Sequence, residues 1–90
     1  MTTKIQTGHA VVTGGGTGIG LAIAQALAAR GHAVTIMGRS IAVLSEASAT
    51  LAGGGHVVCD VTDDASVAAA LAAAQAARGP VRVQIGRAHV

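Results

Sequence analysis

A glycine-rich turn is the part of this 90-residue sequence best suited to chemistry. It reads Thr13-Gly14-Gly15-Gly16-Thr17-Gly18-Ile19-Gly20. The turn matches neither the dinucleotide fingerprint G-x-G-x-x-G, in any register, nor a P-loop, because no Gly-Lys-Ser/Thr follows. It does match T-G-x-x-x-G-x-G. Such a turn between a strand and a helix places backbone N–H groups and a helix N-terminus under a phosphate; a glycine loop without a ligand is the alternative.

Two polar positions further along the chain fit a nucleotide. Arg39 follows the second expected strand, about 20 residues beyond the glycines. In dinucleotide-binding folds the residue at this position contacts the ribose of the cofactor. No acid stands there to bond a 2′-hydroxyl, whereas a guanidinium pairs well with a 2′-phosphate; a solvated surface arginine is the alternative. Asp60, followed by Val61, ends the third expected strand and could accept from an adenine amine, although aspartate also serves in turns and helix caps.

The elements that must position these residues alternate along the chain. Apolar runs predict strands, and apolar periodicity between Gly-rich breaks predicts helices, with Ser40 as the cap of the second helix and Thr62 or Asp63 as that of the third. The expected strands cover 9–13, 33–37, 56–59 and 81–83, and the expected helices about 18–30, 41–52 and 64–77. This order predicts an α/β fold with a three-layer, Rossmann-type parallel sheet, truncated after the start of strand four. Strand four should return beside strand one, with the third helix on the opposite face.

The helices carry candidate core stripes of aliphatic residues. They are Ile19, Ile23, Ala26 and Leu27 in the first helix, Ile41, Leu44, Ala47 and Leu51 in the second, and Val67, Leu71 and Ala74 in the third. The sequence has no Phe, Tyr or Trp. Because aliphatic cores bury little area per residue, we expect marginal stability for the isolated chain.

Composition excludes several function classes. The formal net charge is only +2, with the basic residues scattered along the sequence, which argues against a nucleic-acid partner. Neither a membrane-length apolar run nor a signal peptide is present, so we expect a cytoplasmic protein without a membrane partner. Cys59 should be a buried small hydrophobe. The histidines His9, His32, His56 and His89 lack metal-ligand spacing, and we expect no metal site.

The glycine turn, the Gly38-Arg39 pair and the run Cys59-Asp60-Val61-Thr62-Asp63 together resemble the classical short-chain dehydrogenase/reductase family, over residues 9 to about 83. The resemblance implies a nicotinamide dinucleotide, NADP rather than NAD, an alcohol or carbonyl substrate, and a homo-oligomeric parent enzyme. It also assigns the cofactor-binding residues: Gly14, Gly16, Thr17, Gly18, Ile19 and Gly20 at the diphosphate and ribose, Arg39 assisted by Ser40 at the 2′-phosphate, and Asp60 and Val61 at adenine.

The catalytic residues of that family have no counterpart here. Family members use a Ser and a Tyr-x-x-x-Lys pair, whereas this sequence has no Tyr, and Lys4 is its sole lysine. We therefore expect the cofactor-binding part of an NADP-preferring oxidoreductase, without a catalytic residue. The alternatives are a non-catalytic nucleotide-binding module and a truncated fragment that does not fold, in which strand one would be a bare apolar edge.

The last six residues have a separate interpretation. Residues 85–90, Ile-Gly-Arg-Ala-His-Val, match the translation of a common sequencing-adapter sequence up to its stop codon. We therefore expect residues 1–84 to form a partial NAD(P)-binding domain and residues 85–90 to be a non-native tail.

Overall fold

The structure, a computed structural model, describes residues 8–14, 16, 18–51 and 54–85. Seven elements alternate along them, as the sequence predicts. They are β1 (His9–Thr13), α1 (Gly18–Ala29), β2 (Ala33–Gly38), α2 (Ile41–Ser48), β3 (Gly55–Val58), α3 (Asp64–Arg78) and β4 (Val81–Ile85). The expected strand and helix positions are confirmed, although α2 ends four residues early and β4 runs two residues further than predicted.

The strands form one parallel sheet in the order β3-β2-β1-β4. β1 pairs with β2 over its whole length, from His9 opposite Ala33 to Thr13 opposite Met37. β4 lies on the other side of β1, with a register irregularity between His9 and Ala10. The predicted return of strand four beside strand one is confirmed. The described β1 is therefore an inner strand, and the expectation of a bare edge at strand one is wrong, because β4 extends far enough to cover it.

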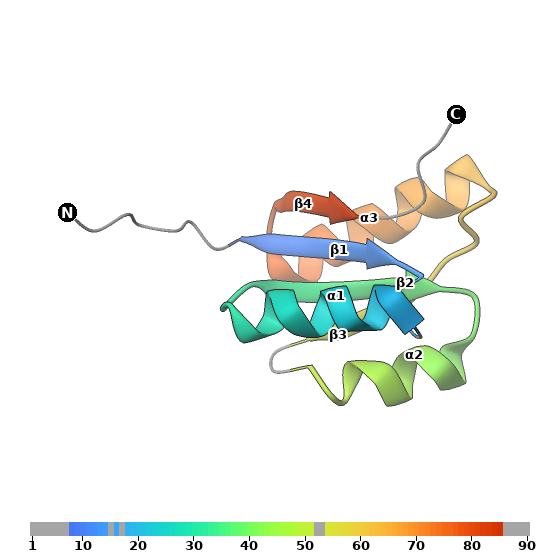
Figure 1. Ribbon diagram of the computed structural model, residues 1–90. Coiled ribbons are helices and arrows are strands. Elements are labelled where there is room, and N and C mark those ends of the chain that lie inside the picture. Colours follow the sequence, from blue (N-terminus) through green and yellow to red (C-terminus); the bar gives the residue numbers. More distant parts are fainter. Residues whose placement is uncertain (1–7, 15, 17, 52–53, 86–90) are drawn as a thin grey trace.

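Helices cover both faces of the sheet, which gives three layers (Figure 1). On one face, α1 and α2 pack over Val12, Val34 and Ile36. On the opposite face, α3 places Ala70 and Ala74 over a cluster of sheet residues. The predicted position of the third helix is confirmed. The central strands are buried on both faces, which explains why their sequences are mostly apolar and do not alternate.

The inward faces of two helices differ from the expected stripes. Ile19 is 81% exposed and Ile41 58% exposed, so neither belongs to the core. In α1 the residues that pack on the sheet are Leu21, Ala24, Leu27 and Ala28. Because α1 is apolar around most of its circumference, periodicity alone could not select its buried face. The other predicted residues of α2, Leu44 and Ala47, are buried, as is Leu51 beyond the helix end.

Buried polar groups tie the amino end of the sheet together. His9 is 3% exposed, and its Nε2 lies 2.7 Å from Oγ1 of Thr35, its Nδ1 2.9 Å from the Gly79 carbonyl oxygen. The Gly79 carbonyl oxygen can only accept, so Nδ1 carries an N–H, and in the neutral tautomer Nε2 accepts from the Thr35 hydroxyl. This histidine joins β1, β2 and the α3–β4 turn. Cys59 is buried, as predicted.

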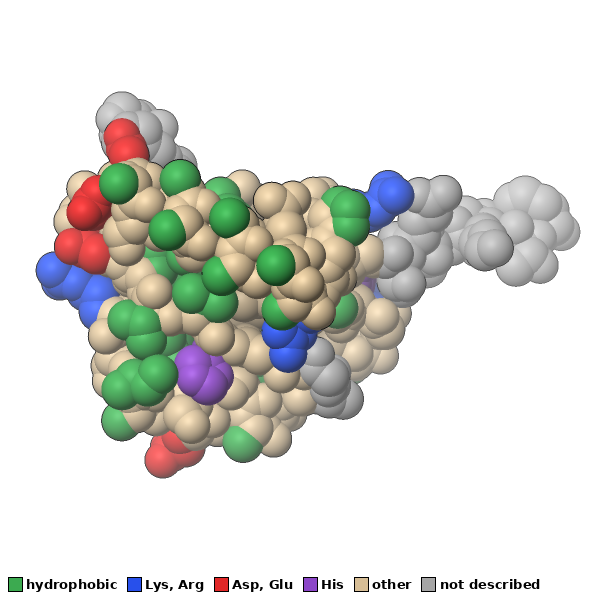
Figure 2. Space-filling view, turned by 180° about the vertical axis from the view of Figure 1, so that it is seen from behind, with side chains coloured by type: hydrophobic (Ala, Val, Ile, Leu, Met, Phe, Trp, Pro, Cys, Tyr) green, Lys and Arg blue, Asp and Glu red, His purple; other side chains and the backbone are tan. Residues whose placement is uncertain are grey.

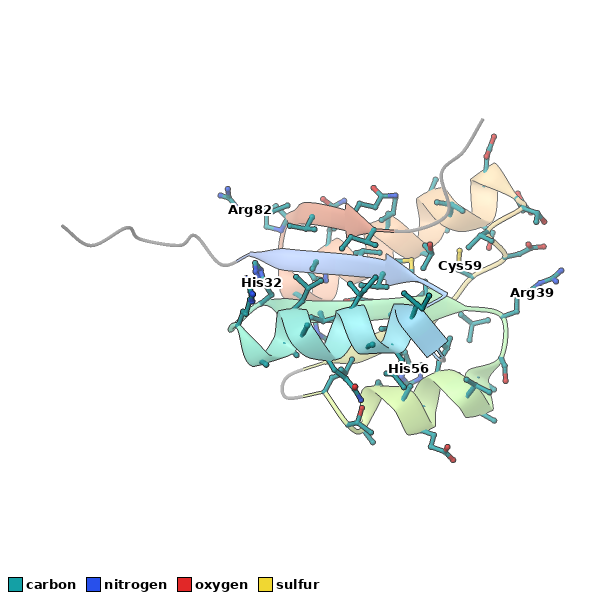
Figure 3. All side chains as sticks on the ribbon, viewed as in Figure 1. His32, Arg39, His56, Cys59 and Arg82 are labelled. Atoms are coloured by element: carbon teal, nitrogen blue, oxygen red, sulfur yellow. The ribbon has the colours of Figure 1, made fainter. Side chains whose placement is uncertain are left out.

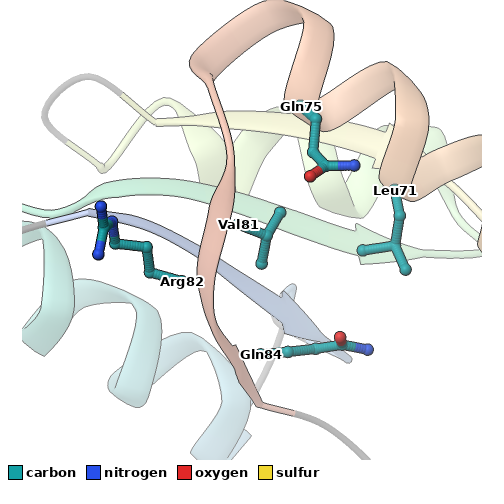
Figure 4. Close-up of a pocket in the computed structure, with 5 residues that line it drawn as sticks. All are labelled: Leu71, Gln75, Val81, Arg82 and Gln84. Carbon is teal, nitrogen blue, oxygen red and sulfur yellow. The ribbon is translucent and has the colours of Figure 1, made fainter.

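A shallow pocket lies between α3 and the edge strand β4, away from the glycine turn. Leu71, Gln75, Val81, Arg82 and Gln84 line it (Figure 4). Among the described residues, no helix combines the length and apolar character needed to cross a bilayer.

Candidate functional site

The carboxyl ends of β1, β2 and β3 meet at one edge of the sheet. Two backbone hydrogen bonds hold the segments that leave these strands: the Gly14 N–H donates to the Met37 carbonyl over 2.8 Å, and the Cys59 N–H donates to the Gly38 carbonyl over 2.7 Å. Figure 3 shows Arg39 and Cys59 at this edge, whereas His32 and Arg82 lie at the amino end. The structure thus brings the glycine turn, Arg39 and Asp60 together, as the sequence predicts.

Two glycines of the turn have backbones that other residues rarely adopt. Gly14 has φ 69° and Gly18 has φ 60°, and no atom approaches the position of a Cβ at either residue within 4 Å. Conformation, not crowding, therefore selects glycine at both positions. Gly18 is also the first residue of α1, where backbone N–H groups lack helical partners and the helix dipole favours an anion.

Gly16 is glycine for a different reason. A Cβ at this position would lie 2.8 Å from Cγ1 of Val43 and 3.6 Å from Cδ2 of Leu44. The turn therefore packs directly on α2, a contact that the sequence interpretation missed. Thr17 and Gly15, which belong to the predicted turn, lie outside the described residues.

The other predicted residues of the turn lie in the first helical turn of α1. Ile19 exposes an apolar side chain to solvent, and Gly20 is half-buried. Ile19 is thus available to a ligand at the sheet edge and is not used by the core.

Arg39 and Asp60 form an ion pair at the sheet edge. Nη2 of Arg39 lies 3.8 Å from Oδ2 of Asp60, and their side chains are 75% and 41% exposed. Blue and red side chains also adjoin at one end of the molecule in Figure 2. In this solvated position the pair contributes little to stability, and both groups are open to solvent at the sheet edge.

Thr62 orients the Asp60 carboxylate. Its hydroxyl donates to Oδ1 of Asp60 over 2.6 Å and its backbone N–H over 2.9 Å. These two hydrogen bonds, followed by the charge of Arg39, hold the pKa of the Asp60 carboxyl below its ordinary value. Asp60 is therefore a carboxylate at neutral pH, able to accept but not donate. The sequence predicts Thr62 as a possible helix cap and not this contact; the D-x-T spacing of an Asx turn is the signal that could have identified it.

Ser40, Asp63 and Val61 complete this edge. Ser40 caps α2, with its Oγ accepting from the Val43 N–H over 3.3 Å. A hydroxyl that accepts this bond can still donate its own hydrogen. The sequence predicts Thr62 or Asp63 as the cap of α3, and Asp63 is confirmed, because its side chain accepts from the N–H groups of Ala65 and Ser66. Val61 is half-buried and packs against the apolar cluster between α3 and the sheet.

The arrangement offers binding groups without a catalytic pair. Phosphates could meet the N-terminus of α1 and the Arg39 guanidinium, and an amine could donate to Asp60. Within residues 8–14, 16, 18–51 and 54–85, no three His, Cys, Asp or Glu side chains are grouped to hold a metal ion. The residues fit the adenosine and diphosphate parts of a dinucleotide.

Comparison with known proteins identifies the family. The sequence matches the short chain dehydrogenase family over residues 8–88. It is 47% identical over 78 residues, 87% of the chain, to the 3-oxoacyl-[acyl-carrier-protein] reductase MabA of Mycobacterium tuberculosis. It is 40% identical over 83 residues, 90% of the chain, to the galactitol 2-dehydrogenase (L-tagatose-forming) of Cereibacter sphaeroides.

A solved structure agrees with the sequence matches. The NADPH-bound short chain oxidoreductase of Pseudomonas aeruginosa PAO1 has a TM-score of 0.84 and 34% identity, with 91% of this chain and 34% of that one covered. The chain spans 29% of the length of the mycobacterial reductase and 32% of that of the galactitol dehydrogenase. The family match covers nearly the whole sequence and includes every element that forms the candidate site. The chain therefore belongs to the short chain dehydrogenase family.

Proposed function

We propose that the chain binds the adenosine and diphosphate parts of NADP at the carboxyl edge of its sheet. The observation that carries the proposal is the position of Arg39, an exposed guanidinium that directly follows β2 and lies beside Asp60. Arg39, assisted by Ser40, would hold the 2′-phosphate, and Asp60 with Val61 would hold adenine. The diphosphate would lie on the glycine turn, against Gly14, Gly16, Thr17, Gly18, Ile19 and Gly20.

NADP is favoured over NAD by the chemistry of this edge. An acidic residue after β2 would accept from a ribose 2′-hydroxyl, but Arg39 stands there, and a guanidinium matches a phosphate in charge and in donor geometry. A charge-assisted hydrogen bond contributes about 1.5–3 kcal/mol in protected sites. Because solvent surrounds Arg39, we expect a preference of about tenfold for NADP, with NAD as the weaker ligand.

The activity proposed for the whole protein is hydride transfer between the nicotinamide and an alcohol or carbonyl substrate. The names of the mycobacterial reductase and of the NADPH-bound oxidoreductase support this reaction class. Bound NADPH would supply the hydride, while the residues of this chain bind and orient the adenosine end of the cofactor. The sequence lacks Tyr, and its one lysine is Lys4, so proton transfer must use groups from elsewhere.

A second candidate is a nucleotide-binding module without catalysis, because the groups gathered at the sheet edge are binding groups. A chimera in which residues 8–83 replace the matching part of the mycobacterial reductase would separate the two. NADPH oxidation with a 3-oxoacyl substrate supports the oxidoreductase, and a folded chimera that binds NADPH without oxidising it favours the module. We further propose a cytoplasmic, homo-oligomeric parent, with residues 1–84 as the native domain and residues 85–90 as an added tail.

Mapping by NMR tests where the cofactor binds. NADP is added to the labelled 90-residue chain, and its amide shifts are followed. We expect saturable shifts at Gly14, Gly18, Arg39 and Val61, with little change at His32 at the amino end of the sheet (Figure 3). Shifts confined to the amino end, or none at any concentration, would reject the proposed site.

A further inference from the structure

We propose that Asp60 sets how strongly this site prefers a 2′-phosphate to a free 2′-hydroxyl, acting through its ion pair with Arg39. This inference rests on the proposed function, because it concerns the same adenosine site. Oδ2 of Asp60 lies 3.8 Å from Nη2 of Arg39. The guanidinium that would receive the 2′-phosphate is therefore already next to a fixed negative charge.

The folded backbone holds residues 39 and 60 side by side. The residues just before them, Gly38 and Cys59, share a backbone hydrogen bond of 2.7 Å. The Asp60 N–H also donates to Oγ of Ser66 in α3 over 3.0 Å. Asp60 is thus anchored to both β2 and α3, and it cannot move away from Arg39 without breaking one of these contacts.

The carboxylate is fixed in orientation as well as in position. Thr62 occupies Oδ1 with two hydrogen bonds, of 2.6 and 2.9 Å, while Oδ2 faces the guanidinium. Thr62 therefore acts as a positioning residue for Asp60. A carboxylate held in this way stays close to any anion that binds Arg39.

Two effects of Asp60 on a bound nucleotide can be separated. The carboxylate can accept from the adenine amine, and this contact is the same with or without a 2′-phosphate. The same carboxylate repels a 2′-phosphate on Arg39 and has no such effect on a neutral hydroxyl. The change in the ratio of the two affinities when the charge of Asp60 is removed therefore reports the repulsion, because the adenine contact cancels in the ratio.

The test compares adenosine 2′,5′-bisphosphate with adenosine 5′-monophosphate as probes, titrated calorimetrically into the wild-type chain and into Asp60→Asn. An asparagine keeps the oxygen that accepts from Thr62 and loses the charge. We expect the preference for the bisphosphate to rise about fivefold, the effect of one unit charge about 4 Å away in water. Asp64→Asn, the same charge change in the first turn of α3, should leave the ratio unchanged.

Each outcome is decisive. An unchanged or lower ratio in Asp60→Asn overturns the inference, and a lower ratio would mean that Asp60 orients Arg39 for the phosphate. If wild type prefers the bisphosphate and Arg39→Ala removes that preference, the proposed function survives even where the Asp60 inference fails. If wild type binds neither probe, both fail. Asp60→Ser, which also suits a turn, repeats the test should the asparagine variant unfold by far-UV circular dichroism.

Discussion

Nε2 of His9 accepts a hydrogen bond from the Thr35 hydroxyl at 2.7 Å, inside a sheet where Thr35 is fully buried. Replacing Thr35 by valine keeps the shape and leaves the histidine nitrogen without its donor. We expect Thr35→Val to lower the free energy of unfolding by about 1–3 kcal/mol, because a buried acceptor loses its partner. Urea denaturation followed by circular dichroism measures the free energy of unfolding of the variant and of the wild type.

Thr35→Ser is the matched control. It keeps the hydroxyl and loses one methyl group, so its effect should be about 1 kcal/mol, the transfer free energy of that group. A valine variant as stable as wild type would show that the His9–Thr35 hydrogen bond is not needed for stability.

Gly14 tests the conformational requirement of the turn. With φ 69° and open space around the Cβ position, alanine is disfavoured only by its backbone. We expect Gly14→Ala to cost about 1–2 kcal/mol of folding free energy, and Gly14→Asn less, because asparagine tolerates the left-handed region. Equal stabilities of the two variants in urea would contradict the described turn.

Gly16 and Val43 should be coupled. A Cβ on residue 16 meets Cγ1 of Val43 at 2.8 Å, and a valine in a helix has little rotamer freedom to retreat. Gly16→Ala should therefore destabilise the chain by about 1 kcal/mol, the lower end of the overpacking range. In a Val43→Ala background the same change should be nearly neutral. A double-mutant cycle with no coupling energy would place the turn away from α2.

Thr62 controls the titration of Asp60. Because its hydroxyl is the main cause of the lowered pKa, Thr62→Val should raise the pKa of the Asp60 carboxyl toward its ordinary value. A carboxyl whose pKa is lower in the folded state adds stability above its unfolded pKa, and this stability is lost as the pH falls through the folded pKa. The variant should therefore lose stability at neutral pH and lose none below both pKa values. Carbon-13 NMR titration of Asp60 measures the shift, and an unchanged pKa would exclude the role given to Thr62.

Much of this fold could be predicted because its signals are local. The run Ala10–Val12 is apolar without alternation, and Val34–Met37 is interrupted only by Thr35. Such runs are typical of strands covered on both faces, and both form inner strands. Ser40 and Asp63 cap the helices that follow them. The carboxyl ends of parallel strands share one edge, so the meeting of Arg39 with Asp60 could also be predicted.

The details that depend on packing could not be predicted from the sequence. The face that α1 buries was missed because Ile19 and Leu21 are equally apolar, and only the docking of the helix on the sheet distinguishes them. The role of Thr62 depends on the turn geometry that places its hydroxyl on Asp60. The contact of Gly16 with Val43 joins segments far apart in sequence, so local sequence patterns do not predict it.

The affinity ratio for NADP over NAD in Arg39→Ala tests the central claim most directly. Arg30→Ala, an exposed arginine between α1 and β2 at the other end of the sheet, is the matched control. The fluorescence of the reduced cofactors can be followed without protein background, because the chain has no aromatic residue. We expect the roughly tenfold preference for NADPH over NADH to be lost in Arg39→Ala and kept in Arg30→Ala. An equal preference in wild type and Arg39→Ala would contradict the assignment of this sheet edge to the 2′-phosphate.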